Sequence, residues 1–164
     1  MRWITLFILA YLTLGIQMGM GEFVRVWGAG PSLVLIAVIF IAMNAKRDAA
    51  LLACFVIGAM QDLTTLTPLG LYALGYSIVG MFVVSTQELL HRAHPVTHFS
   101  LALVGGLLLG AVLFLHGAVR GPSVPLALLF WSALYTAVLA PVVLALLNRI
   151  KKIFAFSRRR FGTA

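Results

Sequence analysis

The chain has 164 residues, of which 62% are hydrophobic, and its 12 Lys and Arg outnumber its 4 Asp and Glu, for a formal net charge of +8 at pH 7. So few polar side chains cannot cover a water-facing surface, which excludes a soluble domain. Half of the basic residues follow the last apolar run, so the charge indicates the cytoplasmic face of a membrane and anionic lipid rather than nucleic acid.

Six apolar segments follow one another and predict an all-α integral membrane protein with a single transmembrane domain, residues 1–147. The first span, about 3–20, is predicted to be an uncleaved anchor. A signal peptide is the alternative, because Gly19 and Gly21 form a small-x-small pattern just after the apolar run.

The second and third apolar runs are each shorter than the roughly 20 residues that a span needs. Fusing them into one helix would bury Lys46, Arg47 and Asp48, at about 2.5–3.5 kcal/mol per charge. We therefore predict two helices with a cytoplasmic turn at these charges, each extended outward to full length. The five spans after the first are predicted at about 27–43, 48–66, 68–87, 99–119 and 125–147.

Three prolines mark predicted helix starts or bends. Pro31 stands where the second helix can begin without losing a hydrogen bond. Thr67 and Pro68 fit the cap and first position of the fourth helix. Pro141 lies inside the last span and predicts a kink.

Basic residues are divided unequally between the two sides of the six spans. Ten lie on the side that holds both termini, and only Arg25 and Arg120 lie on the other, so both termini are predicted in the cytoplasm. The tail, 148–164, mixes bases with apolar residues, which predicts a segment lying on the anionic inner leaflet, with docking of a cytoplasmic partner as the alternative. The tail bases are Arg149, Lys151, Lys152, Arg158, Arg159 and Arg160.

The segment 55–80 holds the main group of candidate functional residues. Gly58 and Asp62 share a helix face, and the glycine leaves room beside the carboxylate. After a turn, small residues recur at spacings of three and four, which predicts a tight hairpin with Asp62 near its tip. The candidate residues, for partner binding or for fixing the hairpin, are Gly58, Asp62, Pro68, Leu69, Gly70, Ala73, Ser77 and Gly80.

Several roles are open for Asp62. Its carboxylate would fix the turn by accepting hydrogen bonds from residues 63–67, or it would pair with Arg25 or Arg120 on the same side. Alternatively, it contacts a partner, or it handles protons or ions as an ionisable group within a membrane.

The sequence lacks the spacing of a catalytic nucleophile and base, and it has no phosphate-binding glycine loop. We therefore expect no enzyme activity and no cofactor. His91, His94 and His98 have a spacing that could gather a metal on a helix, but Pro95 interrupts them, so we predict solvated loop histidines and no metal site.

Taken together, these residues resemble the MreD family, inner-membrane proteins of the bacterial cell-wall elongation machinery. The resemblance implies a non-enzymatic protein that binds the periplasmic scaffold MreC and sits with RodA, its transpeptidase and the actin-like filament protein MreB. The matching residues are Gly58, Asp62, Leu69, Gly70, Ala73 and Leu74 in the hairpin, with Pro31, Phe130, Trp131, Ser132, Pro141 and the basic tail farther out.

The MreD family is also similar in fold to the substrate-binding subunits of energy-coupling-factor vitamin transporters, which supplies a competing function. Such a subunit would dock on a coupling protein through small residues, and Ala133 and Ala137 form a suitable pair. A transporter subunit of this kind would need polar groups in its outer connections to orient a ligand. In this chain the outer connections are short and offer few polar groups. We therefore favour a scaffold whose hairpin and small-residue faces receive the transmembrane helix of a partner.

Overall fold

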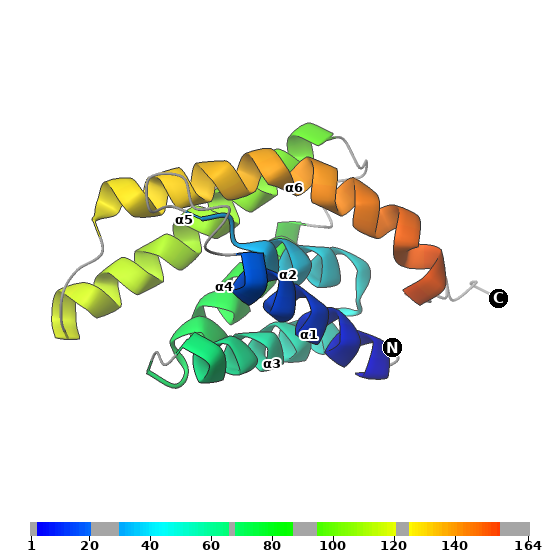
Figure 1. Ribbon diagram of the computed structural model, residues 1–164, viewed down its shortest axis with the longest axis horizontal. Coiled ribbons are helices and arrows are strands. Elements are labelled where there is room, and N and C mark those ends of the chain that lie inside the picture. The colour runs from blue at the N-terminus through cyan, green and yellow to red at the C-terminus, as the bar shows by residue number, and fades with distance from the viewer. Residues whose placement is uncertain (1–2, 21–29, 66–67, 87–94, 121–124, 155–164) are drawn as a thin grey trace.

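The computed structural model describes residues 3–20, 30–65, 68–86, 95–120 and 125–154. Within these ranges the chain is helical and contains no strand, in agreement with the all-α prediction. Figure 1 shows how the helices are arranged. They are α1 (Trp3–Met20), α2 (Leu33–Asn44), α3 (Arg47–Thr65), α4 (Leu71–Thr86), α5 (Pro95–Arg120) and α6 (Leu126–Phe154).

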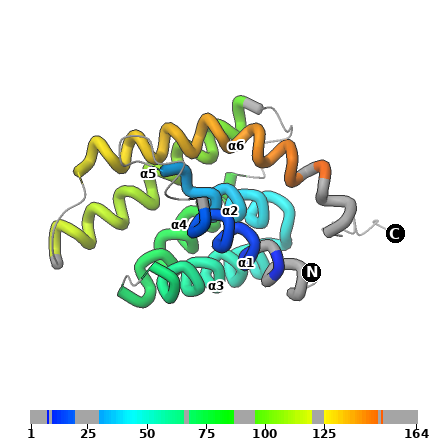
Figure 2. The backbone as a smooth tube through the Cα atoms, in the orientation of Figure 1, coloured from blue at the N-terminus to red at the C-terminus, as the bar shows by residue number. Residues whose placement is uncertain are grey.

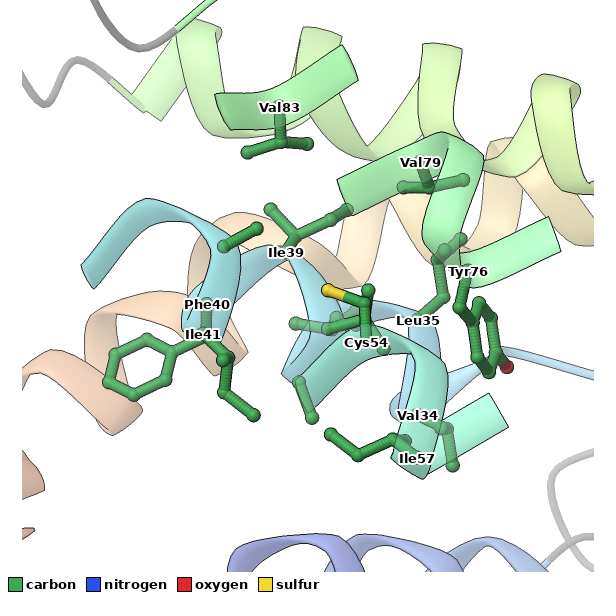
Figure 3. Packing of buried hydrophobic residues seen from close by; sticks show 14 of the residues in the cluster. Val34, Leu35, Ile39, Phe40, Ile41, Cys54, Ile57, Tyr76, Val79 and Val83 are labelled. Atoms are coloured by element: carbon green, nitrogen blue, oxygen red, sulfur yellow. The ribbon is translucent and has the colours of Figure 1, made fainter. Parts of the chain in front are cut away.

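The short helix α2 lies at the centre and packs on each of the other five helices. Its nine consecutive residues from Val34 to Ala42 are all buried. An α-helix that is apolar all round is stable only when it is enclosed on every side. Figure 3 shows the side chains of α2 meeting Cys54 and Ile57 of α3 and Tyr76 and Val79 of α4.

The first turn of α2 differs from the sequence prediction. The helix begins at Leu33, with Ser32 as its N-cap, so it starts two residues after the predicted Pro31 and does not extend outward to residue 27. The prediction assumed that the helix must reach water at both membrane surfaces. It does not need to, because polar side chains of neighbouring helices pair with its first amides, as described below.

The α3–α4 hairpin follows the predicted third and fourth spans, with one change. α3 begins and ends within one residue of the predicted 48–66. α4 begins at Leu71 instead of Pro68, because Gly70 has a φ of +101°, which is incompatible with a right-handed helix. Thr67, the predicted cap of this helix, lies outside the described residues.

The last two helices pack against each other as a long antiparallel pair and cover α2 and α4. α5 begins at Pro95, earlier than the predicted residue 99, since proline is tolerated in the first turn of a helix. α6 continues past the predicted end at 147 into the basic tail and ends at Phe154. It also runs through Pro141, and Figure 1 shows its axis changing direction in the orange stretch that contains this residue.

Within the described residues, three helices are long and apolar enough to cross a membrane: Arg47–Thr65, Val96–Val119 and Leu126–Leu147. α2 and α4 are shorter apolar helices of 12 and 16 residues. Figure 2 shows that these short helices lie between α3 on one side and the α5–α6 pair on the other. The architecture is therefore that of a helical membrane protein with short inner helices.

Candidate functional site

The buried carboxylate of Asp62 joins the end of α3 to the start of α4. Asp62 is only 1% exposed. Its Oδ2 accepts hydrogen bonds from the backbone N–H of Gly70 at 2.9 Å and of Ala73 at 3.2 Å, and its Oδ1 accepts one from Tyr72 at 2.9 Å. Amides at the start of a helix lack intrahelical acceptors, and negative charge is favoured there. Asp62 is thus the cap of α4, supplied by another helix.

The donors that the structure shows for Asp62 come from farther along the chain than the predicted residues 63–67. The hydroxyls of Thr64 and Thr65 donate to the backbone carbonyl of Gln61, at 2.9 and 2.8 Å. Residues 66 and 67, and the side chains of Arg25 and Arg120, lie outside the described part of the structure. The carboxylate therefore fixes the start of the next helix as well as the turn.

Gly58 brings the backbones of α3 and α4 into direct contact one turn below Asp62. A Cβ on Gly58 would lie 2.6 Å from the amide nitrogen of Ala73 and 2.6 Å from the carbonyl oxygen of Tyr72. Such distances leave no room for any side chain. The predicted proximity of Gly58 and Asp62 is therefore what allows the carboxylate to reach the amides of α4.

Ala73 and Gly80, two of the small residues of α4, face α3. A Cβ on Gly80 would stand 2.7 Å from Sγ of Cys54 in α3. Ala73 is buried, and the Ser77 hydroxyl donates to the Ala73 carbonyl at 2.7 Å within α4. At Ala73 and Gly80 the small-residue stripe is therefore covered by α3, whereas Ser77 is half-buried and Gly70 is exposed.

The tip of the hairpin is the exposed part of this segment. Leu69 is 77% exposed and Leu63 is 68% exposed. Pro68 and Gly70 are also exposed, and no atom lies within 4 Å of the position that a Cβ on Gly70 would take. We call Leu63, Pro68 and Leu69 the hairpin tip.

A second buried polar contact lies next to Asp62. The hydroxyl of Tyr76 donates to Oε1 of Gln61 at 2.7 Å, and both residues are buried. The ring of Tyr76 packs at a tilt on that of Tyr72, with centroids 5.9 Å apart. Sequence reasoning missed this pair, although an amide directly before Asp62 in an apolar helix was a usable signal.

The start of α2 is capped in the same way, by side chains of two other helices, α1 and α6. Gln17 of α1 accepts a hydrogen bond from the second amide of α2 at 3.0 Å. Thr136 of α6 accepts one from the N–H of Ser32 at 3.0 Å, and Ser132 donates to the carbonyl of Gly30 at 2.8 Å. Ser132 is among the residues that carried the family resemblance, and this contact gives it a structural role.

The remaining candidate residues are not gathered at this site. Pro31 is half-buried before the cap of α2, and Pro141 lies within α6. Arg149 is exposed on α6. Lys151 and Lys152 lie in α6, but their side chains are not among those described. Arg158, Arg159 and Arg160 lie outside the described residues.

One histidine prediction is wrong. His98 was expected in a solvated loop, but it lies in the first turns of α5 and is only 7% exposed. The prediction failed because α5 begins at Pro95 rather than at residue 99, so His98 lies within the helix. Among the described residues no group of three or more His, Cys, Asp or Glu is arranged to hold a metal ion.

Comparison with known proteins places the chain in a family. A family model described as rod shape-determining protein MreD matches residues 1–150 of the chain. No curated protein and no solved structure matches it, so the expected likeness in fold to energy-coupling-factor subunits stays a prediction. The matched region contains the Asp62 cap, the Gly58 contact and the capped start of α2. The chain therefore belongs to the MreD family of rod shape-determining proteins.

Proposed function

We propose that this protein is a non-enzymatic scaffold of the cell-wall elongation complex in the bacterial inner membrane. Its family establishes a membrane protein with a role in rod shape. The proposal adds six membrane spans, cytoplasmic termini and specific partners. It binds MreC, and it links RodA and its transpeptidase to MreB on the cytoplasmic side, where the basic tail also meets anionic lipid.

The observation that carries the scaffold proposal is the role of Asp62. A carboxylate that handles protons or ions needs freedom to change its partners or its charge. Asp62 is instead bound at both oxygens by backbone amides of α4. This arrangement favours a rigid hairpin that presents a fixed surface to another protein.

The exposed part of that hairpin suggests where a partner binds. Ala73 and Gly80 are covered by α3, which argues against the earlier expectation that a partner helix packs on them. Leu63 and Leu69 are large, apolar and exposed at the hairpin tip. We therefore place the MreC contact at the tip, where the cap holds these side chains in position.

The test is recovery of partners with the tagged protein in mild detergent, identified by mass spectrometry. Leu69→Ser removes an apolar side chain from the tip without touching the Asp62 cap. Leu126→Ser is the matched control, because Leu126 is also exposed but lies at the start of α6. We expect Leu69→Ser to lower MreC recovery at least fivefold, with Leu126→Ser close to wild type.

Equal recovery of MreC from the two variants would remove the tip from the proposed interface. Recovery of a membrane coupling protein with paired ATPases, in place of the wall-synthesis proteins, would overturn the scaffold proposal.

A further inference from the structure

A line of polar contacts inside the protein joins α6 to the α3–α4 hairpin. Thr136 of α6 accepts a hydrogen bond from the N–H of Ser32 at 3.0 Å. The side chain of Ser32 is in turn a hydrogen-bond partner of the Tyr76 hydroxyl in α4. Tyr76 donates to Oε1 of Gln61 in α3 at 2.7 Å, and Gln61 directly precedes Asp62. We call Thr136, Ser32, Tyr76 and Gln61 the Tyr76 network.

The hydrogen bonds of the Tyr76 network depend on one another. Tyr76 donates its only proton to Gln61, so its hydrogen bond with Ser32 uses the proton of Ser32. The oxygen of Ser32 can then accept from the N–H of Leu35, as it does at 3.3 Å. Thr136, Tyr76 and Gln61 are each at most 3% exposed. A hydroxyl removed from this network is therefore not readily replaced by water, and its neighbour loses a partner.

The network ends at the residues that hold the hairpin tip. Asp62 binds the amides of Gly70, Tyr72 and Ala73, and Gly70 directly follows Leu69 of the tip. The rings of Tyr72 and Tyr76 are in contact, with centroids 5.9 Å apart. A displacement of the Tyr76 side chain is thus felt at the start of α4, where the tip is fixed.

Few other routes connect α6 with the hairpin. Among the described helices, α6 packs on α5 and α2 and makes no extensive contact with α3 or α4. The route through α5 includes Leu109, which meets α4 at Gly75 with the end of its flexible side chain. Such an apolar contact adapts to small shifts, whereas a hydrogen bond weakens when its direction changes. The Tyr76 network is therefore the more sensitive connection.

We propose that the Tyr76 network couples the position of α6 to the rigidity of the hairpin tip. Coupling between distant sites is carried by contiguous contacts of this kind, and it is reciprocal. α6 continues as a helix to Phe154, within the basic tail. A partner that holds the tail would then stiffen the tip, and a partner on the tip would hold α6. This consequence rests on the proposed function, whereas the coupling is a property of the protein alone.

Hydrogen exchange of two amides tests the coupling in the purified full-length protein, in mild detergent and without any partner. The amides of Tyr72 and Ala73 both bind Asp62, so their exchange rates report how tightly the start of α4 is held. Mass spectrometry with fragmentation resolves them. The variant Thr136→Val keeps the shape of the side chain but removes the hydroxyl that accepts from Ser32.

We expect Thr136→Val to speed the exchange of both amides about threefold, the effect of one typical hydrogen bond between membrane helices. Thr86→Val is the matched control. Thr86 lies on α4 itself, but its hydroxyl donates to the carbonyl of Phe82 within that helix. The control should leave both rates unchanged. Wild-type rates in Thr136→Val, or an equal acceleration in Thr86→Val, would overturn the proposal.

A second comparison separates the network from a general loosening of the protein. In Tyr76→Phe the network is already broken, so adding Thr136→Val should no longer change the two exchange rates. The same acceleration with and without the Tyr76 hydroxyl would also overturn the proposal, because α6 would then act by another route. Since no partner is present, these results do not depend on where MreC binds.

Discussion

Replacing Asp62 with alanine should destabilise the α3–α4 hairpin far more than loss of an exposed acid. The change removes the acceptor of three backbone amides. Gly70 is exposed, so water can replace its partner, but Ala73 is buried and Tyr72 is half-buried. Each buried amide left unpaired costs about 1–3 kcal/mol, and the charge at the helix start adds up to about 2 kcal/mol. We expect the free energy of unfolding to fall by about 3–5 kcal/mol.

The measurement is the free energy of unfolding in mild detergent, from titration with sodium dodecyl sulfate followed by tryptophan fluorescence. Asp48→Ala is the matched control, because Asp48 is an exposed acid in the first turn of the same helix. It should cost less than about 1 kcal/mol. Asp62→Asn should lie in between, because the amide keeps one oxygen for Gly70 and Ala73 but turns its nitrogen toward the N–H of Tyr72. Equal stability of Asp62→Ala and Asp48→Ala would refute the cap as a source of stability.

Two further substitutions test the packing around this cap by the same titration. Gly58→Ala should lower the free energy of unfolding by about 1–3 kcal/mol, because the added methyl group meets the backbone of α4. Gly15→Ala is the control, because Gly15 has open space around it, and it should raise the free energy of unfolding by about 0.5–1 kcal/mol. Equal effects of the two substitutions would contradict the close contact at Gly58. Tyr76→Phe leaves the buried Oε1 of Gln61 without its donor and should cost about 1–3 kcal/mol, whereas Tyr11→Phe, at an exposed residue, should have no measurable effect. A Tyr76→Phe protein as stable as wild type would show that the hydroxyl contributes nothing.

The hairpin could be predicted from the sequence because its determinants are close together. Gly58 and Asp62 lie one turn apart, and all three amides that bind the carboxylate come within eleven residues of it. Helical periodicity is enough to place such residues on one face. What the pattern left open is which neighbour the small residues of α4 pack against. The answer, α3 of the same chain, depends on tertiary contacts.

Pro31 marked the start of α2 to within two residues, but the extension of the helix to residue 27 was wrong, because the contacts that let it begin later are far apart in the sequence. A rule based on length requires the helix to extend until its amides meet water. The helix can start later than this rule requires. Gln17 accepts a hydrogen bond from the N–H of Val34, and Thr136 accepts one from the N–H of Ser32. Thr136 is 104 residues from Ser32, and nothing in the local sequence shows that the two meet. The position of His98 was missed for a simpler reason, namely that Pro95 was taken to interrupt a helix that it begins.

The central position of α2 sets an order for the assembly of the protein during synthesis. α2 has only 12 residues, too few to remain across a bilayer by itself, and it reaches its final environment only when all five neighbours are present. Thr136 belongs to the last helix to be made. At about 5–20 residues per second, the ribosome needs roughly 5–20 s to travel from Ser32 to Thr136. We therefore expect the second helix to wait at the insertion machinery, paired with α3, until α6 completes the bundle. A chain truncated before α6 should for that reason be degraded rather than accumulate as a smaller folded unit.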